Sequence, residues 1–142
     1  MVDDIDIKII QMLQKDGNLT YTKIAEKLKL NESTVRKRVL SLKKKSVIKK
    51  FTIVLDPVKV GLNTIAVVGI DVAPDKLLEI AQRLAELPET KYVATSTGDH
   101  MIMTEIWARD GRELSQILAG KIGAIEGVKK VCPAIILEKI KE

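Results

Sequence analysis

Cysteine and histidine are almost absent from this chain of 142 residues, which contains one of each, Cys132 and His100. A single cysteine excludes a disulfide within the chain, and a Cys/His zinc site needs more ligands than the chain holds. No nucleophile elbow, phosphate-binding glycine loop or GxGxxG motif is present, and any Ser-His-Asp or Cys-His arrangement would depend on His100 alone. The sequence therefore predicts no enzyme, no metal site and no cofactor.

Long apolar runs and aromatic residues are also scarce. No apolar stretch approaches the roughly 20 residues that span a membrane, and residues 1–4 lack the positive and apolar segments of a signal peptide. We therefore expect a soluble cytoplasmic protein without a membrane partner. Aromatic residues make up 3% of the chain, which leaves few rings to stack on single-stranded bases. The hydrophobic share of 46% is nevertheless enough to build a core.

The charge is distributed unevenly along the chain. Residues 1–50 carry 13 basic and 6 acidic side chains, whereas the remaining residues carry 11 basic and 13 acidic ones. Asp56-Pro57 and Gly61 are typical of turns and separate the two regions. We predict a basic domain over residues 1–50, a linker with one strand over 51–62, and a second domain over 63–142.

The basic domain has the pattern of three short helices. The first covers residues 3–15, the second runs from Thr20 or Thr22 to about residue 29, and the third covers residues 32–45. The spacing of Val35, Val39 and Leu42 buries one face of the third helix. Its first turn is polar and its outer face is basic, and it follows the second helix after only three or four residues. This arrangement is typical of a helix-turn-helix, which binds double-stranded DNA through its second helix.

Hydroxyl, amide and guanidinium groups are the groups that recognise base edges in the major groove. The third helix carries hydroxyl groups or positive charges that could make these contacts at five positions, which are Ser33, Thr34, Arg36, Lys37 and Arg38. Residues 29–50 hold nine basic side chains and one acidic one, which attracts phosphates, and we expect Lys49 and Lys50 to contact the DNA backbone. Residues 1–50 contain 11 Lys and 2 Arg. Such a lysine-rich basic surface also suits an alternative function, that of an architectural DNA-binding protein of low specificity.

The sequence of the second domain predicts an α+β fold of ferredoxin-like type with the element order βαββαβ. Strand-like runs cover residues 64–72, 92–97, 101–108 and 131–138, and amphipathic helices follow Pro74 and Asp110. Gly98-Asp99 predicts a tight turn between the two middle strands.

The predicted sheet is apolar on both faces, although two helices can cover only one of them. The uncovered face has the apolar side chains Ile65, Val67, Met101, Met103 and Trp107. An exposed apolar sheet needs a second cover, so we infer a homodimer through this face. A two-fold dimer places two DNA-binding helices about 34 Å apart, the spacing of half-sites one helical turn apart.

Several short motifs together resemble the Lrp/AsnC (feast/famine) family of transcription regulators, in its archaeal branch. These motifs are residues 3–10, Ile24-Ala25, residues 32–39, Val47-Ile48, Leu55-Asp56-Pro57 before Gly61, Thr97-Gly98-Asp99 and residues 125–128. The resemblance covers almost the whole chain. It implies a winged helix-turn-helix, a linker strand and a βαββαβ regulation domain that dimerises and assembles dimers into octamers.

The resemblance also implies a regulator that binds promoters, including its own, and responds to an amino-acid effector near the Gly-Asp turn. The effector candidates are therefore Gly98, Asp99, His100 and Met101. Here Gly98-Asp99-His100-Met101 replaces the common Gly-Asp-Tyr-Asp, which removes the second carboxylate. The remaining alternative is a metabolite-sensing or enzymatic protein built on the second domain alone, which the lack of catalytic groups disfavours.

Overall fold

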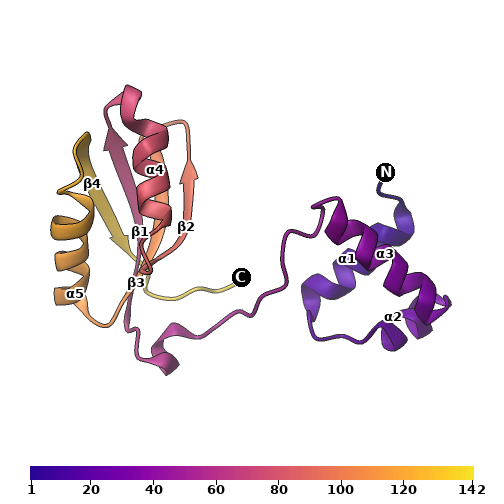
Figure 1. Ribbon diagram of the computed structural model, residues 1–142. Helices are drawn as coiled ribbons and strands as arrows, with labels where there is room; N and C mark the ends of the chain where they lie inside the picture. The colour runs from indigo at the N-terminus through magenta and orange to yellow at the C-terminus, as the bar shows by residue number, and fades with distance from the viewer. The chain divides into compact units, whose positions relative to one another are not determined.

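The computed structural model describes residues 1–142, which form two compact units, Met1–Val54 and Leu55–Glu142. The first unit contains three helices, α1 (Asp4–Lys15), α2 (Tyr21–Leu28) and α3 (Glu32–Lys44), labelled in Figure 1. The second unit contains a four-stranded sheet with two helices. Each unit has a separate hydrophobic core.

Side chains at the N-termini determine where α1 and α2 begin. The Asp6 backbone N–H donates to Asp3 Oδ1 at 2.9 Å, and the Asp3 N–H donates to Asp6 Oδ2 at 3.2 Å. This reciprocal capping satisfies two backbone donors that have no partner inside the helix. Thr20 caps α2 in the same way by accepting from the Lys23 N–H at 3.2 Å. The first helix thus begins after Asp3, and of the two starts that the sequence allowed for the second helix, Thr20 and Thr22, the structure uses Thr20.

The core of the first unit lies where the three helices meet. Ile9 of α1, Ile24 of α2 and Val35 and Val39 of α3 are fully buried. Lys29 ends α2 in the left-handed conformation with φ at 57°, so that the Leu30 N–H donates to the Ala25 carbonyl at 2.9 Å. The turn between α2 and α3 is therefore three residues long, which confirms the predicted helix-turn-helix geometry.

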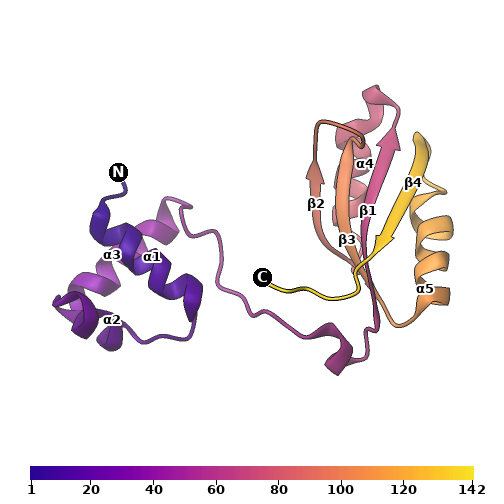
Figure 2. The same ribbon diagram turned by 180° about the vertical axis from the view of Figure 1, so that it is seen from behind.

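The second unit has the element order βαββαβ that the sequence predicted. Its elements are β1 (Thr64–Val72), α4 (Leu77–Ala85), β2 (Thr90–Thr95), β3 (Ile102–Ala108), α5 (Gly111–Gln116) and β4 (Val128–Ile135). The strands pair antiparallel in the order β2-β3-β1-β4, which is the ferredoxin-like arrangement. Both helices lie on one face of the sheet, as Figures 1 and 2 show from opposite sides.

The helix-covered face supplies the core of the second unit. Five fully buried side chains of this face pack in the core with residues of the two helices. They are Ala66, Val68 and Ile70 of β1 and Ile102 and Ile106 of β3. Successive residues of a strand point to opposite faces, so Val67, Gly69 and Asp71 of β1 lie on the other face, which we call the open face. Neither helix of the second unit covers the open face.

The structure corrects three expectations about local structure. No strand forms at residues 51–55, because the chain offers no backbone partner there, and a 3-10 helix (Pro57–Val60) follows instead. The β2–β3 connection is a six-residue loop, residues 96–101, rather than a tight turn. The helix after Asp110 is α-helical only to Gln116 and continues as a π-helix (Ile117–Ile122).

Candidate nucleic-acid interface

The orientation of α3 is determined by its apolar stripe. Val35, Val39 and Leu42 are buried against α1 and α2, so the opposite side of the helix faces solvent. Ser33, Arg36 and Lys37 are exposed there, whereas Thr34 is half-buried. The structure thus brings three of the predicted base contacts together on an exposed surface with a strong positive charge.

Arg38 occupies a different position from the other predicted contacts. Its Nη1 donates to Asp3 Oδ1 at 2.8 Å, to Asp3 Oδ2 at 2.7 Å and to Asp6 Oδ1 at 3.1 Å. These bonds raise the pKa of Arg38, and the bond from Arg38 lowers the pKa of Asp3. Arg38 therefore links α3 to the capped N-terminus of α1, and contact with a base would require breaking this link.

Arg36 also has a carboxylate partner, although in a more open setting. It pairs with Glu32 one turn earlier on α3, and both side chains are about half exposed. Its guanidinium also lies 5.9 Å from the centroid of the Tyr21 ring. An exposed pair of this kind contributes little to stability, so Arg36 can exchange Glu32 for a phosphate or a base at small cost.

The lysines that follow α3 lie in an irregular segment. Ser46 has a φ of 59°, a left-handed conformation that glycine adopts more easily, and Lys49 and Lys50 follow it as exposed side chains. Lys43, in the last turn of α3, lies 5.5 Å from the centroid of the Phe51 ring. The five lysines from residue 43 to residue 50 are all exposed and thus form a cationic surface suited to phosphates rather than to a particular base.

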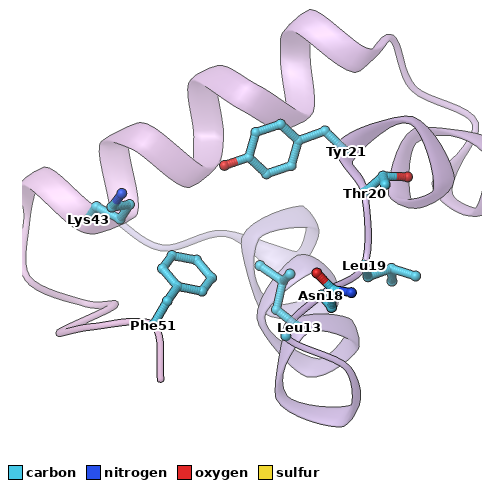
Figure 3. Close-up of a pocket in the computed structure, with 8 residues that line it drawn as sticks. Leu13, Asn18, Leu19, Thr20, Tyr21, Lys43 and Phe51 are labelled. Carbon is cyan, nitrogen blue, oxygen red and sulfur yellow. The ribbon is translucent and has the colours of Figure 1, made fainter. Parts of the chain in front are cut away.

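A hollow of about 440 Å³ lies beside these lysines, between the α1–α2 connection and the end of α3. Figure 3 shows Phe51 between Lys43 and Leu13, with the Tyr21 ring reaching toward α3. The lining residues are Leu13, Gly17, Asn18, Leu19, Thr20, Tyr21, Lys43 and Phe51. The chain that leaves α3 therefore lines this hollow at Phe51, whose side chain is 46% exposed.

The second unit contains the predicted effector loop. Gly98 has a φ of 104°, and the exposed Asp99 carboxylate follows it. The His100 ring lies directly on Gly69 of the open face, since a β-carbon at Gly69 would come within 2.2 Å of the ring. His100 Nδ1 is 3.3 Å from Asp71 Oδ1, and the Ser96 hydroxyl donates to the His100 carbonyl at 2.6 Å. Of the four effector candidates, Asp99 is thus available to a ligand, whereas His100 is packed on the sheet.

The predicted dimer surface is the open face itself. Val67, Met103 and Trp107 are half-buried there, and Ile65 is 8% exposed. The expectation for Met101 is wrong, because this residue lies in the β2–β3 loop and packs against the core on the helix-covered side of the sheet. The face is less apolar than the sequence suggested, because Glu105 lies on it and is 8% exposed. Trp107 Nε1 donates to Glu105 Oε2 at 2.8 Å, and Lys139 Nζ donates to the same oxygen at 3.0 Å.

Three features of the two candidate surfaces, the DNA-binding face and the open face, are not predicted from the sequence. Glu105 and its partner Lys139 are 34 residues apart, and no sequence pattern indicates such a pair. The Asp3–Arg38 link spans 35 residues and is equally invisible. The exposed Leu40 on α3 could have been found, since it lies outside the stripe of Val35, Val39 and Leu42.

Two kinds of feature are absent from the structure. No helix has the length and apolar character that crossing a membrane requires. No three side chains among the His, Cys, Asp and Glu residues are grouped closely enough to hold a metal ion.

Each of the two units matches the model of a known domain family. Residues 2–49 match the family model of winged helix-turn-helix DNA-binding domains, and residues 65–142 match that of the Lrp/AsnC ligand binding domain. The chain is 48% identical over 141 residues to the HTH-type transcriptional regulator LrpA of Pyrococcus horikoshii, which covers 99% of this chain and 100% of the relative. It is 35% identical to LrpA1 of Halobacterium salinarum, over 94% of each chain.

Solved structures show the same fold over the whole chain. Escherichia coli AsnC superposes with a TM-score of 0.87 at 21% identity and covers 100% of this chain and 96% of its own. A Neisseria meningitidis transcriptional regulator, solved as a complex with L-Met, has a TM-score of 0.90 at 24% identity and covers 100% and 94%. With both domain models matched in order and archaeal relatives aligned from end to end, this chain belongs to the Lrp/AsnC family of HTH-type transcriptional regulators.

Proposed function

We propose that this regulator binds specific sequences in double-stranded DNA through the exposed face of α3. The observation that carries the proposal is the exposure of Ser33, Arg36 and Lys37 on one side of a helix whose other side is buried. The half-buried Thr34 hydroxyl lies at the edge of this face. Lys49 and Lys50 bind phosphates and set the depth of α3 in the groove. Arg38 serves to hold α3 against α1 through Asp3 and Asp6.

The active form is a homodimer in which two open faces cover each other. Two features support it: half-buried apolar side chains on a sheet face that neither helix of the second unit covers, and the unpaired residues 51–55. Ile53 is 77% exposed and Val54 is 70% exposed, although both residue types favour strands. Pairing of this segment with the same segment of a second copy would satisfy its backbone groups. Dimers then assemble into octamers, as the family resemblance implies.

An amino acid is the effector class that suits the second unit. The matched model is a ligand binding domain, and the structurally similar Neisseria regulator was solved with L-Met. In this chain the exposed Asp99 carboxylate, which follows Gly98, can accept hydrogen bonds from an ammonium group. Because His100 and Met101 stand where the family commonly has Tyr and Asp, Asp99 is the one carboxylate that this loop segment offers.

Fluorescence anisotropy tests the DNA proposal. The duplex upstream of the protein's own gene is titrated beside a shuffled duplex of equal length, at two salt concentrations. Sequence recognition predicts that the natural duplex binds at least about 10³-fold more tightly than the shuffled one. Equal affinity for the two duplexes with a steep salt dependence would contradict specific recognition at that promoter.

Equal affinity would instead favour low-specificity architectural binding, which one structural observation supports. Both arginines of the first unit, Arg36 and Arg38, are paired with carboxylates of the chain, so that lysines provide most of the free positive charge. Lysine binds phosphate as a point charge and lacks the rigid planar fork of donors that arginine presents to guanine.

A further inference from the structure

A single large apolar side chain lies on the exposed side of α3. Leu40 is 54% exposed and does not belong to the core of the first unit. The other apolar residues of α3, Val35, Val39 and Leu42, are all buried. At this exposure about half of the Leu40 side chain is free to contact a partner.

The position of Leu40 relative to the candidate base contacts is regular. Ser33, Arg36, Lys37 and Leu40 are spaced i, i+3, i+4 and i+7, so they lie along one stripe of the helix. A helix that lies in the major groove contacts base edges with residues at this spacing. Leu40 is therefore the fourth member of the stripe and continues it toward the C-terminus of α3.

The surroundings of Leu40 indicate which partner covers it. Arg36 and Lys37 lie one turn before it and Lys44 one turn after it, and all three are exposed. An apolar protein surface that covered Leu40 would bury these cations without partners, which is costly. Double-stranded DNA has phosphates for the cations and one apolar group in the major groove, the C5-methyl of thymine.

We propose that Leu40 contacts the C5-methyl group of a thymine and thereby selects thymine over cytosine or uracil at one position of each half-site. This inference rests on the proposed DNA binding through α3. The contact is apolar and needs no hydrogen bond, so it adds to the polar contacts of Ser33 and Lys37 without competing for their acceptors. Removal of one buried methyl group corresponds to about a four-fold loss of affinity for each half-site.

The test removes the methyl group from the DNA and the side chain from the protein. The preferred duplex is first selected from a random library with the full-length wild-type protein. Each thymine of that duplex is then replaced by deoxyuridine, which lacks only the C5-methyl. Affinities are measured for the wild type, for Leu40→Ala and for Leu78→Ala, a control that truncates another exposed leucine, on α4. Alanine favours helices, and Leu40 lies outside the core, so the variant keeps its fold.

The expected result is one thymine in each half-site whose replacement weakens wild-type binding about four-fold. Leu40→Ala should bind the unmodified duplex about as weakly as the wild type binds the modified one, and should lose nothing further on deoxyuridine replacement. Leu78→Ala should behave as the wild type, and Leu40→Met, which keeps an apolar side chain, should retain most of the sensitivity to the methyl group.

Two results would overturn the inference about Leu40, and only the second would also overturn the proposed DNA binding through α3. If the selected duplex binds specifically but no thymine is sensitive, or Leu40→Ala is as sensitive as the wild type, Leu40 does not contact a thymine and the DNA proposal stands. If selection enriches no sequence at all, sequence-specific binding through α3 falls together with this contact.

Discussion

Replacing Gly69 by alanine should have opposite effects on stability in two backgrounds. In the wild type the new β-carbon would lie 2.2 Å from the His100 ring, so the ring must leave the open face and lose its 3.3 Å contact with Asp71. Such overpacking costs about 1–3 kcal/mol. Gly69 has no positive φ, so alanine also recovers about 0.4–1 kcal/mol by restricting the unfolded chain. The net expectation is a loss of about 1.3 kcal/mol, the difference between the midpoints of these two ranges.

In a His100→Ala background the obstructing ring is absent, and only the gain of about 0.4–1 kcal/mol from the unfolded chain remains. Gly69→Ala should therefore stabilise that variant. Urea denaturation followed by fluorescence measures both differences, because Trp107 is the only tryptophan and lies in β3 of the same sheet. Protein concentration is held constant, since dimer formation would add to the apparent stability. The same sign of change in both backgrounds would refute the account of the His100–Gly69 contact.

Three further predictions concern the DNA-binding unit and the open face. Because Arg38 lowers the pKa of Asp3, the ionised carboxylate stabilises the fold above its unfolded-state pKa, and this stabilisation is lost as the pH falls through the lowered folded-state pKa. Arg38→Met should thus lose less stability than the wild type between about pH 5 and pH 2 in thermal unfolding followed by circular dichroism, and parallel losses would argue against the link. Val67→Lys should give monomers in sedimentation, whereas Leu78→Lys should not; an unchanged profile for Val67→Lys would exclude this dimer face. Lys49→Ala and Lys50→Ala should weaken binding to all duplexes about equally and lower the salt slope by about one unit for each lost phosphate contact, and a sequence-dependent loss would contradict that role.

The parts of the fold that the sequence predicts well are those controlled by neighbouring residues. The apolar spacing of Val35, Val39 and Leu42 and the capping residues Asp3 and Thr20 act over one or two turns, and the helices form where they indicate. Strand β1 likewise matches the predicted residues 64–72, because it is rich in β-branched residues and the buried residues on its helix-covered face are all apolar.

The parts that could not be predicted depend on residues far apart in the chain or on a second chain. Arg38 has the residue type and helix position of a base contact, and only the tertiary packing of α1 brings Asp3 to it. Residues 51–55 have the composition of a strand, but a strand also needs a partner, and composition does not say whether the partner belongs to the same chain. The Glu105–Lys139 pair on the open face depends in the same way on the register of the sheet and the path of the C-terminal residues.

Lys37→Ala tests most directly the claim that the exposed face of α3 recognises sequence. Its affinity is measured by anisotropy on the selected duplex and on the shuffled one, beside wild-type protein, at one salt concentration. If Lys37 contacts a base, the variant should lose about ten-fold or more on the selected duplex and much less on the shuffled one, so that the specificity ratio falls. An equal loss on both duplexes would mean that Lys37 binds phosphate only, and the central claim about α3 would be contradicted.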